Sequence, residues 1–278
     1  MAAKKPEANV PAVQRISVPG IEKLDDEMLA ELEGVEGAGL SDNVEDRGTP
    51  LLYLAQKNSP QVEPRDAKYI EGLKPGMAFN NLTGEKYDAE NDGIVFLPCF
   101  MKMTWDEWTP RDNGGGFHGS HDRNTPLIRK AKPFIHPKSK KTRRDIYVMD
   151  NGHELKLTAR YYGVIAATWS PIVLPMASTN LGCSTKLQAL ISAMKIETGG
   201  RIIPKPAFWT KFLLKTTYET NDDGNWFQWT AGIEGKNEDK QLREFCKAFA
   251  MAASRNEVKE AAPVEEMGGA PNDDDIPV

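Results

Sequence analysis

The stretch that decides the fold is RDIYVMDNGHELKLTARYY, residues 144–162. Two runs rich in β-branched and aromatic residues, 144–149 and 153–162, flank Asp150-Asn151-Gly152. Such runs are typical of strands, and an Asn-Gly pair supplies the positive φ angles that a tight hairpin turn needs. The stretch therefore predicts an antiparallel β-hairpin.

Outward from this hairpin, the same strand composition recurs in five more segments. They are residues 76–81, 94–104, 171–176, 208–218 and 225–233. Apolar residues at three- and four-residue spacings predict a helix over about 181–196, which Gly199-Gly200 stops, and a final helix covers about 238–253. This order predicts an α+β domain, mainly antiparallel β, with an OB-fold-like barrel and added helices as the candidate architecture.

Positive charge is concentrated in residues 123–160, with 11 basic and 3 acidic side chains. Its densest part, KSKKTRR at 138–144, precedes the hairpin, where a flexible loop can follow a phosphate backbone. The alternatives are a solvated loop or a counter-ion for the chain's own acidic tail. The basic candidates for nucleic-acid binding are Arg111, Arg123, Arg129, Lys130, Lys132, Lys138, Lys140, Lys141, Arg143, Arg144, Lys156 and Arg160.

Aromatic residues near this charge favour single strands over duplex, because unpaired bases stack on exposed rings while Lys and Arg hold phosphates. The candidates are Trp105, Trp108, Phe117 and Tyr147. Trp105 and Trp108 are three residues apart, so on a strand they face opposite sides and at most one can stack on a base. Between them and the basic segment, residues 112–119 (DNGGGFHG) predict a mobile glycine loop, without the Lys-Ser or Lys-Thr of a P-loop.

The two flanks differ from the body in composition. Residues 1–50 carry 5 basic and 11 acidic side chains and residues 258–278 carry 1 and 6, whereas residues 51–257 carry 29 and 23. Both flanks are poor in aromatic residues, which favours disorder. We expect a flexible acidic arm over 1–50, a β-rich nucleic-acid-binding domain over 51–256 and a disordered acidic tail over 257–278.

The acidic tail closes with three carboxylates and a short apolar end: Asp273, Asp274, Asp275, Ile276, Pro277 and Val278. Such a peptide can plug a small apolar pocket ringed by basic side chains. This ending resembles the tail of bacterial and phage single-stranded DNA-binding proteins (SSBs), which reads as acids followed by Ile-Pro-Phe. The resemblance implies that the tail recruits replication and recombination proteins, with Val278 giving less apolar contact than Phe. The alternative is a solubilising acidic tail.

The body, residues 69–249, resembles uncharacterised proteins of tailed bacteriophages, with a Leu-Thr-Gly-Glu turn at 82–85, a Trp-x-Pro-Arg segment at 108–111 and a glycine run. The resemblance implies a phage origin and offers no catalytic residues. Together these features predict a phage-type SSB that protects single-stranded DNA without strong sequence preference, without a cofactor and without enzymatic activity. The oligomeric state stays open.

The expected compartment is the cytoplasm, that of the host if a phage encodes the chain. The sequence contains no run of about 18 apolar residues that would indicate a membrane span, and the first residues lack the apolar stretch of a signal peptide. Cys99, Cys183 and Cys246 stand singly, without the spacing of a zinc or redox motif, and are expected to be reduced packing residues.

Other functions stay open as alternatives. Asp145 and the triplet Glu154-Leu155-Lys156 lie on the two arms of the predicted hairpin, as the Mg²⁺-binding acids and lysine of a restriction-type nuclease would; the plain reading is surface ion pairing. A strand-annealing factor, and a phage interaction or structural protein without DNA contact, are further alternatives. His118, His121 and His136 lack a fourth ligand at standard spacing, so no metal site is expected.

Overall fold

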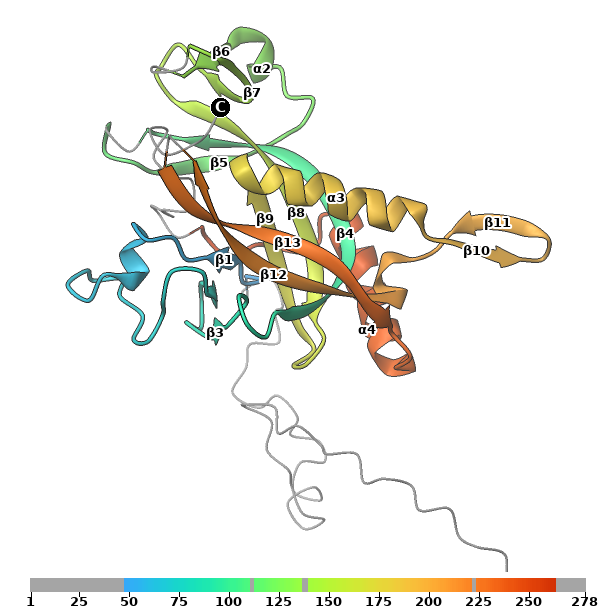
Figure 1. Cartoon of the computed structure of the whole chain (residues 1–278). Helices are drawn as coiled ribbons and strands as arrows, with labels where there is room; N and C mark the ends of the chain where they lie inside the picture. Colours follow the sequence, from blue (N-terminus) through green and yellow to red (C-terminus); the bar gives the residue numbers. More distant parts are fainter. Residues whose placement is uncertain (1–47, 111–112, 137–139, 222–223, 264–278) are drawn as a thin grey trace, which may run out of the picture. The chain divides into compact units, whose positions relative to one another are not determined.

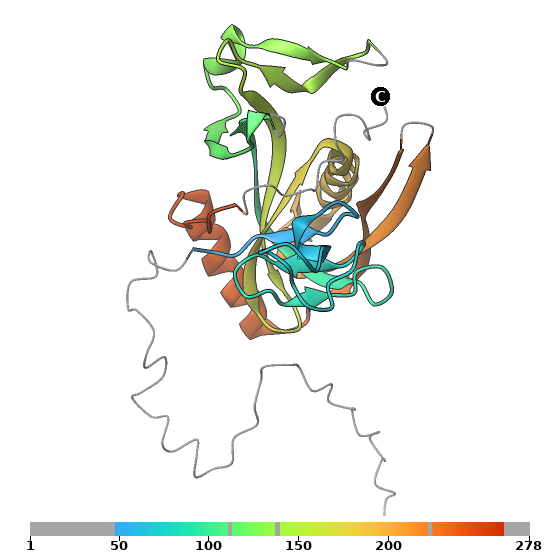
Figure 2. The ribbon, with the colours of Figure 1, turned by 90° about the vertical axis from the view of Figure 1, so that its left-hand side faces the viewer.

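The computed structural model describes residues 48–110, 113–136, 140–221 and 224–263. These residues form a mainly antiparallel α+β fold around one eight-stranded sheet, with the strand order β13-β12-β4-β8-β7-β6 and with β5 and β9 paired to β4 and β8. The sheet curls into a half-barrel, consistent with an OB-like fold (Figures 1 and 2). The expected fold class is therefore confirmed.

The predicted hairpin is present, and its second strand lies at the centre of the sheet. β7 (Thr142–Val148) and β8 (Glu154–Ile165) pair antiparallel, and Tyr147 lies opposite Leu155. Gly152 in the connecting turn has a φ of +83°, a region that glycine adopts without steric cost. β8 then continues beyond β7 and pairs along nearly its whole length with β4 (Ile94–Trp108). β4 and β8 are thus the central pair of the sheet.

Different strands complete the two ends of this central pair. They are β5 (Phe117–Asp122), β6 (Lys132–Ile135), β9 (Ser170–Ala177), β12 (Thr210–Asn221) and β13 (Gly224–Lys236). At one end β12 pairs with the start of β4, and β9 pairs with the later part of β8. At the other end β5 pairs with the last residues of β4, and β7 pairs with the first residues of β8. Because β7 contacts β8 through only a few residues, the β6–β7 ribbon and α2 (Leu127–Lys130) project from this end of the sheet (Figures 1 and 2).

Two helices and a small sheet cover the main sheet. They are α3 (Leu181–Ala193), α4 (Lys240–Ser254) and a sheet of β1 (Leu52–Leu54), β2 (Ala78–Asn80) and β3 (Lys86–Tyr87). The largest core cluster joins Phe96, Tyr161 and Phe212 of the main sheet to Leu187 of α3. A separate cluster packs α4 on the sheet through Cys246, against Leu97 and Val164. None of the helices in the described part of the chain is long and apolar enough to cross a membrane.

The helix predicted over 181–196 ends earlier, at Ala193. The chain then forms a two-stranded ribbon of β10 (Lys195–Thr198) and β11 (Arg201–Pro204), with Gly199-Gly200 as its turn at φ +55° and +73°. The glycine pair therefore reverses a strand and does not stop a helix, so this part of the prediction was wrong. The ribbon projects as an arm, and its Ile202 side chain is 74% exposed.

The glycine-rich segment also differs from the expected loop. Residues 117–122 form β5, in which Gly119 pairs with Glu107 of β4, so the second part of the predicted loop is a strand. Hydrogen bonds to β4 supply the order that glycine composition alone does not predict. Residues 111–112 lie outside the described part.

The described ends of the two flanks contact each other and the body. Thr49 forms a parallel bridge with Glu260, and its backbone N–H donates to the carbonyl of Lys259 at 2.7 Å. A Cβ added to Gly48 would lie 2.7 Å from the Cα of Ala261, which is itself buried. The folded body thus extends a few residues into both expected flanks. Residues 1–47 and 264–278 lie outside the described residues.

The central strand pair predicts a sharp effect of one added methyl group. Gly163 of β8 lies against Phe96, and an added Cβ would lie 2.2 Å from the Phe96 ring and 2.7 Å from the carbonyl oxygen of Leu97. Gly163→Ala should therefore lower the free energy of unfolding by about 1–3 kcal/mol or more, because a backbone oxygen cannot move aside. Chemical denaturation measures this loss. The control, Gly232→Ala in β13, meets no atom within 4 Å and should not destabilise the chain; equal stability of both variants would contradict the packing.

Candidate nucleic-acid interface

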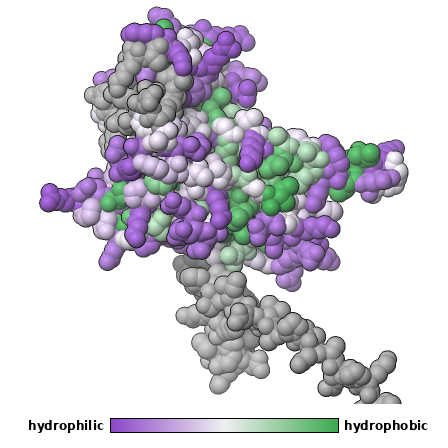
Figure 3. All heavy atoms as spheres, in the orientation of Figure 1, coloured by the Kyte–Doolittle hydropathy of each residue, from purple (hydrophilic) through white to green (hydrophobic). Residues whose placement is uncertain are grey.

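The predicted basic segment divides into an exposed group and a buried group. We call residues 123–136 and 140–148 the basic lobe; it comprises α2, β6, β7 and their connections, at the top of Figure 1. Its surface is predominantly hydrophilic (Figure 3). The exposed basic side chains are Arg123, Arg129, Lys130, Lys132, Lys140, Lys141 and Arg144. Arg111 and Lys138 lie outside the described residues.

Arg143 differs from its neighbours on the lobe because it is buried. Its side chain is 9% exposed, forms an ion pair with Asp145 and donates to the hydroxyl of Ser178 at 3.2 Å. Asp145 is the sole acid among the described residues of the lobe. A buried arginine thus occupies the lobe's one described carboxylate, so the exposed charge of the lobe is positive. Arg143, predicted to contact nucleic acid, is instead buried and bound to Asp145 and Ser178.

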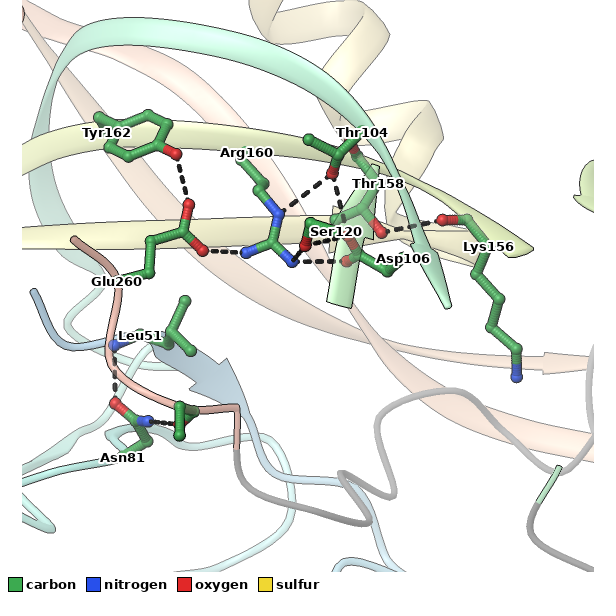
Figure 4. Close-up of polar contacts among 11 residues, drawn as sticks. Leu51, Asn81, Thr104, Asp106, Ser120, Lys156, Thr158, Arg160, Tyr162 and Glu260 are labelled. Atoms are coloured by element: carbon green, nitrogen blue, oxygen red, sulfur yellow. Dashed lines mark hydrogen bonds and ion pairs between the residues drawn. The ribbon is translucent and has the colours of Figure 1, made fainter. Parts of the chain in front are cut away.

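Arg160 is the second buried arginine, on β8, with 2% of its surface exposed. Figure 4 shows its guanidinium between Asp106 of β4 and Glu260 of the segment after α4. The Nη2 atom lies 2.7 Å from Asp106 Oδ2, and Nη1 forms an ion pair with Glu260. Arg160, predicted to contact nucleic acid, is instead held inside the protein by both carboxylates.

Hydroxyl groups complete the set of hydrogen bonds around Arg160. Thr104 Oγ1 accepts from Nε at 3.1 Å, and Ser120 Oγ of β5 accepts from Nη2 at 2.9 Å. Both hydroxyls donate to Asp106, at 3.0 Å and 2.7 Å. Tyr162 donates to the second oxygen of Glu260. Burial opposes the charge of Arg160, but the charges of Asp106 and Glu260 raise its pKa above the ordinary value, so the guanidinium stays protonated.

The four predicted aromatic residues are only partly available to a ligand. Trp105 is buried; its indole N–H donates to the carbonyl of Arg123 at 3.1 Å, and its ring meets Tyr147 edge to face at 5.3 Å between centroids. Trp108 and Phe117 are half-buried and pack together at 5.0 Å, and Tyr147 is half-buried as well. Trp105 is thus a packing residue, while Trp108 and Phe117 beside the lobe and Tyr147 within it keep partly exposed surfaces.

A polar cluster lies where β4, β5 and β8 meet, and sequence reasoning found only part of it. Glu107 accepts from His121 Nε2 and His153 Nδ1, each at 2.7 Å. The His118 ring stacks on that of His153 at 4.1 Å, and His118 Nε2 lies 2.6 Å from Thr109 Oγ1. Neither Glu107 nor His153 was a candidate, although Glu107 stands between the two tryptophans and His153 follows the Asn-Gly turn.

The residues of the nuclease hypothesis are not brought together as a metal site. Asp145 is bound by Arg143, and Glu154 is buried with its carboxylate 2.9 Å from the Lys156 ammonium. This ion pair also leaves Lys156 less available to a phosphate. Fully buried His136 lies near the β6–β7 turn, apart from the cluster around Glu107. Within the described ranges, no group of three or more His, Cys, Asp or Glu side chains could hold a metal ion.

The contrast between buried and exposed arginines predicts that their replacement has very different effects on stability. Arg160→Met should lower the free energy of unfolding by about 3–5 kcal/mol, because it leaves two carboxylates without their cation. Arg144→Met, at an exposed position of β7, should change the free energy of unfolding by no more than about 0.5 kcal/mol. Urea denaturation at neutral pH compares the two variants. A stable Arg160→Met protein would show that the buried ion cluster does not hold the sheet together.

Comparison with known proteins places the chain in a family. No curated protein and no solved structure matches it. The family model described as Pam3 phage gp34-like protein matches residues 19–259, which includes nearly the whole described body and all of the basic lobe. The chain therefore belongs to the family of Pam3 phage gp34-like proteins.

Proposed function

We propose that this phage protein binds single-stranded DNA without strong sequence preference and protects it. The observation that carries the proposal is the basic lobe, which presents seven exposed Lys and Arg side chains and a single described acid that Arg143 occupies. Each exposed cation can displace a counterion condensed on the phosphate backbone. Such contacts carry no sequence information, which agrees with non-specific binding.

Partly exposed rings beside the lobe favour single strands as the ligand. Trp108 on β4 and Phe117 on β5 lie beside the lobe, and Tyr147 lies on β7, within the lobe. Bases that are not paired can stack on such rings, whereas the bases of a duplex are already stacked on each other. The combination of cations and rings therefore supports single-stranded over double-stranded DNA.

The acidic residues 273–278 complete the proposal as a recruitment segment for replication or recombination proteins. The last described part of the chain is fixed to the body, since Glu260 pairs with Arg160 and the carbonyl of Ala262 accepts from Asn81. A peptide that follows this anchor in sequence stays tethered to the DNA-binding body. Tethering raises the effective concentration of any captured partner at the DNA.

One observation favours a second candidate function, a phage interaction or structural protein without DNA contact. The β10–β11 arm leaves the body, and its Ile202 and Ile203 side chains are exposed. Two-stranded ribbons are only marginally stable in water, so such an arm is suited to gain stability from a partner. Absence of DNA binding at low salt, together with assembly that Ile202→Lys abolishes, would favour this function over the first.

Charge reversal tests the basic lobe directly. The triple change of Lys140, Lys141 and Arg144 to Glu should weaken binding to oligo(dT) and to mixed-sequence single strands alike. It should also reduce the slope of log affinity against log salt by about 2, because three phosphate contacts are lost at about 0.7 each. Fluorescence anisotropy with labelled single strands and duplex at several salt concentrations measures both.

The matched control reverses Lys236, Lys240 and Lys247, which are exposed at the end of β13 and on α4. It changes the net charge by the same amount but should leave the salt slope nearly unchanged. Equal losses in both triple variants would mean that total charge, and not the lobe, determines binding. Tighter binding of duplex than of single strands would also contradict the proposal.

Removal of the acidic segment tests the recruitment role. Deletion of residues 273–278 should abolish capture of replication and recombination proteins from infected-cell lysate and leave the unfolding temperature unchanged. Val278→Phe should increase capture, because the ring adds apolar area at the anchoring end. Affinity capture with mass spectrometry compares the three proteins, and identical partner sets for full-length and truncated chains would reduce the segment to a solubilising tail.

A further inference from the structure

We propose that Glu107 and its three histidines, which we call the histidine cluster, form a pH-dependent phosphate-binding site that adds to the hold of the basic lobe on single-stranded nucleic acid. The inference rests on the proposed function. The cluster consists of Glu107, His118, His121 and His153. It collects three of the four histidines of the chain at one point of the sheet.

The hydrogen bonds of Glu107 fix which ring nitrogens carry hydrogen. A carboxylate only accepts, so His121 Nε2 and His153 Nδ1 both donate to it. The remaining nitrogens, His121 Nδ1 and His153 Nε2, accept when the rings are neutral and donate when they are protonated. Phosphate oxygens are acceptors, so they are bound well only by the protonated rings. Both side chains are about one quarter exposed, at 28% and 24%, which leaves them accessible to a ligand.

The charge balance of the cluster changes sign with protonation. Burial opposes ionisation of Glu107, but hydrogen bonds and charges from His153 and His121 hold its pKa below the ordinary value. The ionised carboxylate compensates one imidazolium. A second protonated ring makes the cluster cationic, and His118 stacked 4.1 Å from His153 would add a repulsive third charge. A phosphate anion relieves that repulsion and so stabilises the protonated form.

The charged groups near the cluster do not prevent its histidines from responding to pH, because each is paired with another residue or exposed to solvent. On β4 the adjacent Asp106 is bound by Arg160, and on β8 the adjacent Glu154 is bound by Lys156. Asp122, next to His121 on β5, is exposed, so solvent screens its effect. Asp150 in the β7–β8 turn is also exposed. The carboxylate that contacts the rings directly is thus Glu107.

The position of the cluster connects it to the basic lobe. His121 lies on β5 two residues before Arg123, where the lobe begins. His153 follows the turn that joins β7 of the lobe to β8, and it hydrogen bonds through its carbonyl to the backbone N–H of Met149. Trp108 and Phe117, which pack together, flank Glu107 and His118 in sequence. A single-stranded nucleic acid that crosses the lobe therefore also meets the aromatic rings of Trp108 and Phe117 and the imidazoles of the histidine cluster.

The sign of the pH effect follows from linkage. A bound phosphate favours the charged imidazole, so it raises the pKa of the cluster histidines relative to the free protein. Affinity for single-stranded DNA should then rise as the pH falls and the rings become protonated. A rise of one pKa unit for one ring corresponds to about a tenfold gain in affinity.

The experiment compares oligo(dT) affinity at pH 8.0 and pH 5.8 at constant salt. The wild type should bind about tenfold more tightly at the lower pH. The double variant His118→Asn, His153→Asn should lose this gain between pH 8.0 and pH 5.8. The control His136→Gln removes the one histidine outside the cluster and should keep the gain. Thermal unfolding at both pH values checks that each variant is folded.

The outcomes separate this inference from the proposed function. Wild-type protein that binds oligo(dT) at neither pH would overturn the proposed function. Binding without pH dependence, or a gain that the double variant keeps or that His136→Gln abolishes, would overturn the phosphate site and leave the function standing. As a second readout, NMR titration with inorganic phosphate should raise the pKa of the cluster histidines and not that of His136; equal shifts for all four, or none, would contradict a built site.

Discussion

The buried guanidinium of Arg160 is the interaction on which the rest of the structure depends. It lies on the part of β8 that pairs with both β4 and β9, and it joins β8 to Asp106 of β4, to Ser120 of β5 and to Glu260 of the segment after α4. A cation removed from water is stabilised only when carboxylates and hydroxyls surround it. The burial of Arg160 therefore requires that four separate parts of the chain come together.

The contacts of Arg160 also determine where the candidate interface lies in the fold. β5 is attached to the sheet through β4 and through the Ser120 contact to Arg160, and the chain leaves β5 directly into the basic lobe. The lobe itself is attached through the short β7–β8 pairing and through Arg143, which reaches Ser178. Two buried arginines thus hold the region in place, while the other described lysines and arginines of the lobe are exposed. The structure divides one basic segment into these two roles.

The sequence predicted local structure well and long-range contacts poorly. The Asn151-Gly152 turn and the β-branched composition of its flanks are local signals, and they located the central hairpin correctly. The Gly199-Gly200 pair led to a wrong prediction, because Met194 continues the helical spacing of Leu190 and Ile191 and a glycine pair can end a helix as well as turn a ribbon. Only the pairing of β10 with β11 distinguishes the two.

The same limit applies to the candidate site. Composition identified the exposed lysines and arginines, but it treated Arg160 as one more exposed cation. The partners of Arg160 lie 54 and 100 residues away, at Asp106 and Glu260, so no local pattern reveals its burial. Likewise, His118 and His121 of β5 meet His153, just before β8, only in the folded sheet, where β4 with Glu107 pairs with both strands. Alternation along β8 shows two faces but not which partner covers each face.

The central claim, that the basic lobe is the surface that receives single-stranded DNA, is tested most directly by hydrogen–deuterium exchange with and without oligo(dT). The account predicts slower exchange at residues 117–148, on β5, α2, β6 and β7, and unchanged exchange on α4 and on the β10–β11 arm. Slower exchange confined to α4, β13 or the arm, or no change at saturating oligo(dT), would contradict it.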